Sequence, residues 1–118
     1  MAITKTSTKV AGHGWMVSAT SADLSTTEEL RAAPASGVSI YLEYISINSA
    51  TAHTVTIGEG ETTDNVTTVI VQPVTFTTGG GQYEIHFTRP LKLTAATSLT
   101  ADASVIGAVH ITAYGYEK

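Results

Sequence analysis

The segment VSIYLEYISIN, residues 38–48, has the clearest strand pattern in the chain. Ile40 and Leu42 occupy one parity of the alternation, whereas Ile45 and Ile47 occupy the other. Successive side chains of a strand point to opposite faces, so a change of parity indicates a β-bulge or a strand that is covered on both faces. The segment therefore predicts a long strand with one of these two features near its middle.

Shorter alternating runs lie on both sides of this strand and are separated by turn residues. They occupy residues 14–20, 54–57, 66–71, 74–76, 83–87, 91–93, 99–105 and 109–116. Threonine fills 21 of the 118 positions, and threonine, valine and isoleucine pack well on a pleated sheet. About eight short strands at this spacing predict an all-β fold, an antiparallel β-sandwich of jelly-roll type.

A helix is indicated only near residues 25–32, where Ser25 and Glu28 have the spacing of a capping box. We expect at most one short helix there. The length of the chain is typical of a single domain, which we place at residues 13–118. Residues 1–12 alternate threonine, serine and lysine with few apolar side chains. We expect them to form a flexible N-terminal arm that orders only on a neighbouring molecule.

Period-two alternation also selects the residues expected in the core, because such a pattern buries one face of a strand. The predicted core residues are Ile45, Ile47, Val55, Ile57, Val69, Val71, Ile85, Phe87, Val109 and Ile111. Trp15 alternates with Val17 and is expected in the core as well.

The charge balance and the missing residue types exclude several classes of function. The chain has 6 Lys and Arg against 10 Asp and Glu, a net charge of −4, which argues against a nucleic-acid partner. It has no cysteine, and therefore no disulfide, thiolate ligand or cysteine nucleophile. No apolar run approaches the ~20 residues that span a bilayer, and the first residues lack the apolar core of a signal peptide. We expect no membrane partner.

Motifs for catalysis are missing as well, and we expect no catalytic residues, no cofactor and no metal site. The chain lacks the Gly-x-Ser-x-Gly pattern of a nucleophile elbow, and the glycines at 79–81 precede neither a lysine nor a helix. No two of the 4 histidines have metal-ligand spacing. Glu59, Glu61 and Asp64 lie in a glycine-broken segment. Their spacing departs from that of an EF-hand, so we interpret the segment as a solvated turn.

The last predicted strand carries aromatic residues on the side that should face solvent. Val109 and Ile111 mark its buried parity, and His110, Tyr114 and Tyr116 have the other parity. Tyrosine combines an apolar ring with a polar tip and is enriched at protein interfaces. The candidate interface residues are Tyr41, Tyr83, His86, His110, Tyr114 and Tyr116. The alternative, in which a long loop of the monomer covers this face, stays equally open.

Three parts of the chain together resemble small virion proteins of tailed bacteriophages. They are SIYLEYISINS at 39–49, a glycine-rich hairpin that leads into FTRPLKL at 87–93, and the terminal stretch at 98–116. The resemblance covers residues 38–117 and concerns capsid decoration (cement) proteins and other accessory head proteins. It implies a β-sandwich that assembles as a homo-oligomer, with a trimer as the expected state. It also implies the major capsid protein lattice as a partner, and a virion location after assembly in the host cytoplasm.

Two classes of function follow from these observations. The first is a non-enzymatic structural virion protein, a capsid decoration protein that stabilises a phage head. The second is a carbohydrate- or ligand-binding jelly-roll module, which would use exposed Trp and Tyr rings as stacking platforms. The chain has only 1 Trp, so the first class is favoured. An enzyme ranks third, because no set of residues supports a reaction.

Overall fold

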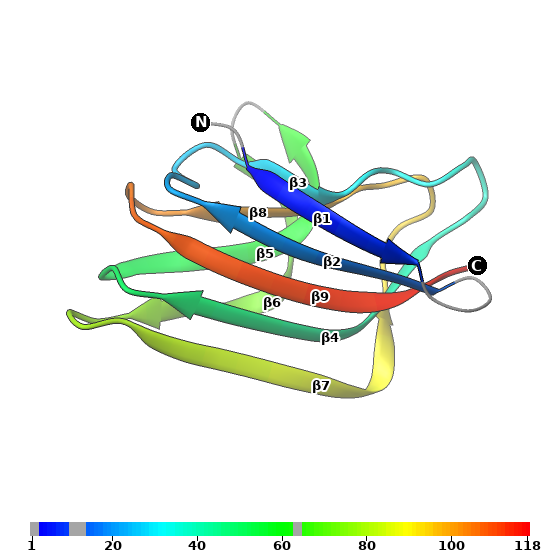
Figure 1. Ribbon diagram of the computed structural model, residues 1–118. Helices are drawn as coiled ribbons and strands as arrows, with labels where there is room; N and C mark the ends of the chain where they lie inside the picture. The colour runs from blue at the N-terminus through cyan, green and yellow to red at the C-terminus, as the bar shows by residue number, and fades with distance from the viewer. Residues whose placement is uncertain (1–2, 10–13, 63–64) are drawn as a thin grey trace.

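The computed structural model describes residues 3–9, 14–62 and 65–118, which form two antiparallel sheets packed into a sandwich (Figure 1). The strands are β1 (Thr4–Lys9), β2 (Gly14–Ser21), β3 (Glu28–Arg31), β4 (Ile40–Ser49), β5 (His53–Thr62), β6 (Asn65–Phe76), β7 (Gly81–Lys92), β8 (Leu99–Ala103) and β9 (Val109–Glu117). The described residues contain no helix that is long and apolar enough to cross a membrane.

The order of the strands identifies the architecture. One sheet has five strands in the order β1-β2-β9-β4-β7, and the other has four in the order β3-β8-β5-β6. Apart from β5 and β6, which form a hairpin, consecutive strands from β2 onward alternate between the sheets. This is the connectivity of the jelly roll, in which two Greek keys wrap around one core. The predicted all-β sandwich of jelly-roll type is confirmed.

Strand β4 contains a bulge, which is one of the two features that its change of parity predicted. Against β9, two steps of β4 from Leu42 to Tyr44 match one step of β9, so Glu43 is the additional residue. Against β7, the same two steps of β4 match five of β7, from Leu91 to His86, so the additional residues there belong to β7. Because the bulge reverses the parity, Leu42 before it and Ile45 after it both point into the core, where each is fully buried. The change of parity in the sequence therefore reflects a bulge, and the apolar side chains of β4 lie on one face.

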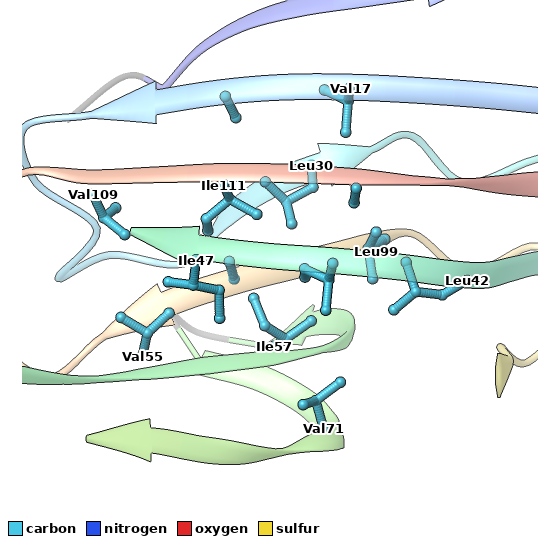
Figure 2. Packing of buried hydrophobic residues seen from close by; sticks show 14 of the residues in the cluster. Val17, Leu30, Leu42, Ile47, Val55, Ile57, Val71, Leu99, Val109 and Ile111 are labelled. Atoms are coloured by element: carbon cyan, nitrogen blue, oxygen red, sulfur yellow. The ribbon is translucent and has the colours of Figure 1, made fainter. Parts of the chain in front are cut away.

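The core lies between the two sheets, and Figure 2 shows side chains from both meeting there. Seven of the predicted core residues are buried, as is Trp15, which is 2% exposed. Ile85 and Phe87 are half-buried and pack against the core from the edge strand β7. The core also includes residues that the alternation did not select, among them Leu24, Leu30, Ile40, Leu42, Leu93 and Leu99.

The prediction that Val69 lies in the core is wrong, because its side chain is 51% exposed. Ile57 pairs with Val71, but its neighbour Gly58 pairs with Val69. One step along β5, from Ile57 to Gly58, therefore pairs with two steps along β6, from Val71 to Val69. This makes Ile70 the additional residue of a bulge. Val69 consequently lies opposite Gly58, on the outer face, although it has the same parity in the sequence as Val71.

The expectation of at most one short helix near residues 25–32 is met without a helix, since this region contains strand β3. The Asp23 carboxylate accepts hydrogen bonds from the Ser25 N–H at 2.8 Å and the Ser25 hydroxyl at 2.5 Å. The Ser25 hydroxyl is thereby engaged in a local turn instead of capping a helix. Leu30 then enters the core at 2% exposure while β3 pairs with β8. Burial of one leucine in the sandwich outweighs a weak local helix pattern.

Part of the segment predicted as a flexible arm forms a strand in this structure. Thr4–Lys9 form β1, which pairs with β2 over six residues and is an edge strand of the five-stranded sheet. Strand pairing uses backbone N–H and C=O groups, so a segment with few apolar side chains can still extend a sheet. Ile3 supplies one apolar contact with the core. The other residues of the predicted arm, 1–2 and 10–12, lie outside the described residues.

Candidate interaction surface

Four tyrosines and a histidine form a continuous strip on the outer face of the five-stranded sheet. The strip comprises Tyr41 and Tyr44 on β4, Tyr114 and Tyr116 on β9, and His86 on β7. The register places Tyr41 beside Tyr116 and Tyr44 beside Tyr114, with His86 next to Tyr44 on the other side. These three strands are adjacent in the sheet (Figure 1). We call this set the aromatic strip.

The tyrosine rings of the aromatic strip stack in pairs. The centroids of Tyr41 and Tyr116 are 4.7 Å apart with an interplanar angle of 10°, and those of Tyr44 and Tyr114 are 5.0 Å apart at 15°. Neighbouring strands are themselves about 4.8 Å apart, so near-parallel rings at this distance must stand upright on the sheet. Each pair therefore turns ring faces toward one another and ring edges toward solvent.

His86 and Glu84 hold one end of the aromatic strip in place. The imidazole of His86 packs at 4.5 Å from the ring of Tyr44 and at 57° to it. The Tyr44 hydroxyl donates a hydrogen bond of 2.5 Å to the Glu84 carboxylate, which raises the pKa of Tyr44 above its ordinary value of 10.0. Tyr44 is thus fixed by ring contacts on both sides and by a charge-assisted hydrogen bond at its tip.

Beyond the aromatic strip, two rows of this outer face carry mainly polar side chains, with the Glu84 carboxylate beside Ser46. The next row across the sheet contains Ser18, Thr112 and Ser46, followed by a row with Thr20, His110 and Asn48. His110 is exposed, and its Nε2 atom lies 2.9 Å from the Ser18 hydroxyl. The face therefore combines half-buried aromatic rings with hydroxyl, amide and imidazole groups.

The structure brings together four of the six predicted interface residues. Tyr41, His86, Tyr114 and Tyr116 belong to the aromatic strip, whereas His110 lies on the same face in a separate row. Tyr83 points to the opposite side of β7 and packs against the core, as its alternation with Ile85 and Phe87 could have indicated.

Sequence analysis also missed Tyr44, which is central to the strip. Its neighbour Ile45 is fully buried, so Tyr44 must point outward. The sequence contained this information, because anchoring the alternation on Ile45 assigns Tyr44 to the solvent side. The bulge at Glu43 then aligns it with Tyr41 on the same face.

A buried serine–histidine pair lies at the turn between β4 and β5. The Ser49 hydroxyl is 2.8 Å from His53 Nε2, and His53 Nδ1 is 3.4 Å from the carbonyl oxygen of Val105. A backbone carbonyl therefore faces the second ring nitrogen, where a catalytic triad would have a carboxylate. Ser49 also accepts a hydrogen bond of 3.1 Å from the Thr51 N–H. We assign the pair a structural role in fixing this turn.

The acidic segment that was interpreted as a solvated turn is largely strand. Strand β5 continues through Glu59 and Glu61 to Thr62, and Asp64 lies outside the described residues. Glu59 is 8% exposed, and its two carboxylate oxygens accept the Thr94 N–H at 3.1 and 3.3 Å. Within the described ranges, no three His, Asp or Glu side chains are grouped so that they could hold a metal ion.

The buried carboxylate leads to a test of stability. Glu59→Ala leaves the Thr94 N–H without its partner, and we expect it to lower the free energy of unfolding by about 1–3 kcal/mol. Glu61→Ala is the matched control, because Glu61 is exposed and its loss should change stability by less than about 0.5 kcal/mol. Urea denaturation measures both values. Equal effects of the two substitutions would show that the hydrogen bond between Glu59 and Thr94 contributes nothing to the free energy of unfolding.

Comparison with known proteins does not assign this surface to a family. No protein family model matches the chain, and no curated protein matches it.

Proposed function

We propose that the protein is a non-enzymatic structural component of a phage virion, a capsid decoration protein that assembles as a homo-oligomer. The observation that carries the proposal is the aromatic strip on the outer face of the five-stranded sheet. Residues 38–117 resemble small virion proteins of tailed phages, and this resemblance indicates a phage particle as the location of the protein. The aromatic strip is a surface through which copies of the protein can associate. The expected state is a trimer.

The chemistry of the strip suits contact with protein. Tyrosine rings are enriched at the centres of interfaces, because they bury a large apolar area while the hydroxyl group keeps a hydrogen bond. The four tyrosines are half-buried, and their ring contacts among the described residues are with each other and with His86. The ring edges stay accessible to a partner. Since the stacked rings are already ordered, association costs little side-chain entropy.

The open edges of the sandwich also favour assembly. Strands β1 and β7 end the five-stranded sheet, and β3 and β6 end the four-stranded sheet. Edge strands present unpaired backbone groups that can extend a sheet into a neighbouring molecule. A neighbour that covers one of these edges would also shield the half-buried apolar side chains of β6 and β7, which include Ile70 and Ile85.

The alternative of a carbohydrate-binding module with aromatic platforms has less support. Such a module stacks a sugar on an exposed ring face, whereas the tyrosine faces in the strip are turned toward each other. The single tryptophan, Trp15, is buried, and its indole N–H donates to the Tyr116 carbonyl oxygen. Neither residue type offers an open platform on this surface.

Native mass spectrometry of the purified protein and cryo-electron microscopy of the source particle test the proposal. We expect a stable homo-oligomer, with three copies as the leading species, and density for it on the outside of the capsid. A protein that stays monomeric at high concentration and is missing from purified particles would refute the proposal.

Deletion of residues 2–10 tests whether the N-terminal segment contributes to capsid attachment. The deletion removes β1, an edge strand whose side chains at Thr4, Lys5 and Thr6 are exposed. Because little apolar surface is lost, we expect Tm to fall by only about 5 °C, while binding to capsids is lost. Differential scanning calorimetry and co-sedimentation with capsids measure the two effects. Unfolding of the shortened protein would instead make β1 an essential strand of the domain.

A further inference from the structure

A groove of about 710 Å³ opens at one end of the sandwich. It lies where the outer face of the five-stranded sheet meets the turns that follow β2 and β4, the turn between β6 and β7, and the residue before β9. Figure 1 shows these turns together at the left end of the molecule. We call this feature the end groove. The groove residue His110 and the strip residue Tyr114 both lie on β9, four positions apart. The end groove and the aromatic strip are therefore separated by about 13 Å along this strand.

The floor of the end groove is a row of polar side chains in register across four neighbouring strands. Thr4 pairs with Thr20, Thr20 with His110, and His110 with Asn48, and all four residues line the groove. At the usual spacing of strands, this row is about 14 Å long. Such a row presents hydroxyl, imidazole and amide groups at regular intervals to whatever occupies the groove.

These polar groups are available for a ligand. The Asn48 amide and the hydroxyls of Thr4 and Thr20 make no side-chain hydrogen bond with any other residue that the structure describes. His110 uses Nε2 toward Ser18, which leaves Nδ1 open. All four floor residues are exposed. The row therefore offers both donors and acceptors without first breaking contacts within the protein.

The walls of the end groove are small and apolar. Ala22, Ala50 and Ala108 line it with exposed methyl groups. Gly80 keeps the β6–β7 turn close to the turn that follows β4, because it adopts a φ of +72° and a Cβ there would lie 2.0 Å from the Ser49 carbonyl oxygen. A larger residue at this position would push the β6–β7 turn away from the groove.

We propose that the end groove binds a neutral saccharide. None of the lining residues is Asp, Glu, Lys or Arg, so the groove offers no charge to a phosphate, a carboxylate or a cation. Sugar hydroxyls both donate and accept hydrogen bonds, as do the threonine, asparagine and histidine side chains of the floor. The C–H faces of a sugar ring match the alanine methyl groups of the walls. The site is separate from the aromatic strip and does not depend on the proposed role in a capsid.

The test is a printed array that carries neutral, sialylated and sulfated oligosaccharides, followed by calorimetric titration of the strongest neutral glycan. We expect binding to neutral glycans only. Asn48→Ala removes the amide from the floor and should weaken the affinity about tenfold. Ala50→Trp fills the groove and should abolish binding. A thermal melt of each variant verifies that it is folded.

Gln82→Ala is the matched control. Gln82 is exposed and continues the same cross-strand row beyond Asn48, but it does not line the groove. Its substitution should leave the affinity unchanged. The inference is overturned if the array shows no neutral glycan above background, if only charged glycans bind, or if Asn48→Ala and Gln82→Ala bind as tightly as the unmodified protein.

Discussion

Gly115→Ala is expected to lower the free energy of unfolding by about 3 kcal/mol or more, the cost of severe overpacking in a core. Gly115 lies on β9 between β2 and β4 and is buried. A Cβ at this position would lie 1.8 Å from the carbonyl oxygen of Tyr41. Because that atom belongs to the backbone of the bulged strand, only a displacement of β4 or β9 could relieve the clash.

Gly37→Ala separates this steric effect from the general cost of replacing a glycine. Gly37 has a φ of +81°, but a Cβ there meets no atom within 4 Å. We expect a loss of about 1–2 kcal/mol from the strained backbone alone. Chemical denaturation followed by far-ultraviolet circular dichroism measures both variants. A Gly115→Ala protein as stable as the unmodified one would mean that β4 and β9 are spaced differently from the arrangement described.

Tyr114→Arg is expected to convert the proposed oligomer into a monomer while the subunit stays folded. Tyr114 belongs to the aromatic strip, where its ring stacks on that of Tyr44 and lies 6.2 Å from the ring of His86. An arginine there would place an unpaired charge in the middle of the interface. Loss of a central aromatic contact costs at least about 2 kcal/mol of binding free energy, and the buried charge adds to this.

Thr68→Arg is the control for the added charge. Thr68 is exposed on β6, in the other sheet, so its substitution should leave assembly through the aromatic strip intact. Size-exclusion chromatography with light scattering gives the mass of each variant, and thermal melts show whether it is folded. If Tyr114→Arg keeps the mass of the unmodified oligomer, copies associate through another surface.

Local alternation in the sequence was a good guide to strands that cross the middle of a sheet. In residues 38–48 the apolar positions changed parity, and the structure has a bulge at Glu43 that brings Leu42 and Ile45 to the same face. Alternation was a poorer guide at the periphery. The bulge at Ile70 turns Val69 outward, and nothing in the local pattern around Val69 indicated it. Edge strands have one neighbour, so irregular pairing there is less constrained.

The candidate surface was predictable only in part. The sequence alone determined that β9 has an apolar face and a face with His110, Tyr114 and Tyr116, because side-chain direction in a strand follows from its two-residue period. Which strands flank β9 was decided by the tertiary structure. The jelly-roll connectivity places β4 next to β9 and β7 next to β4, and only this order makes Tyr41, Tyr44 and His86 part of one strip. Strand order depends on how the two sheets close around a shared core. It therefore cannot be predicted from the periodicity within a single strand.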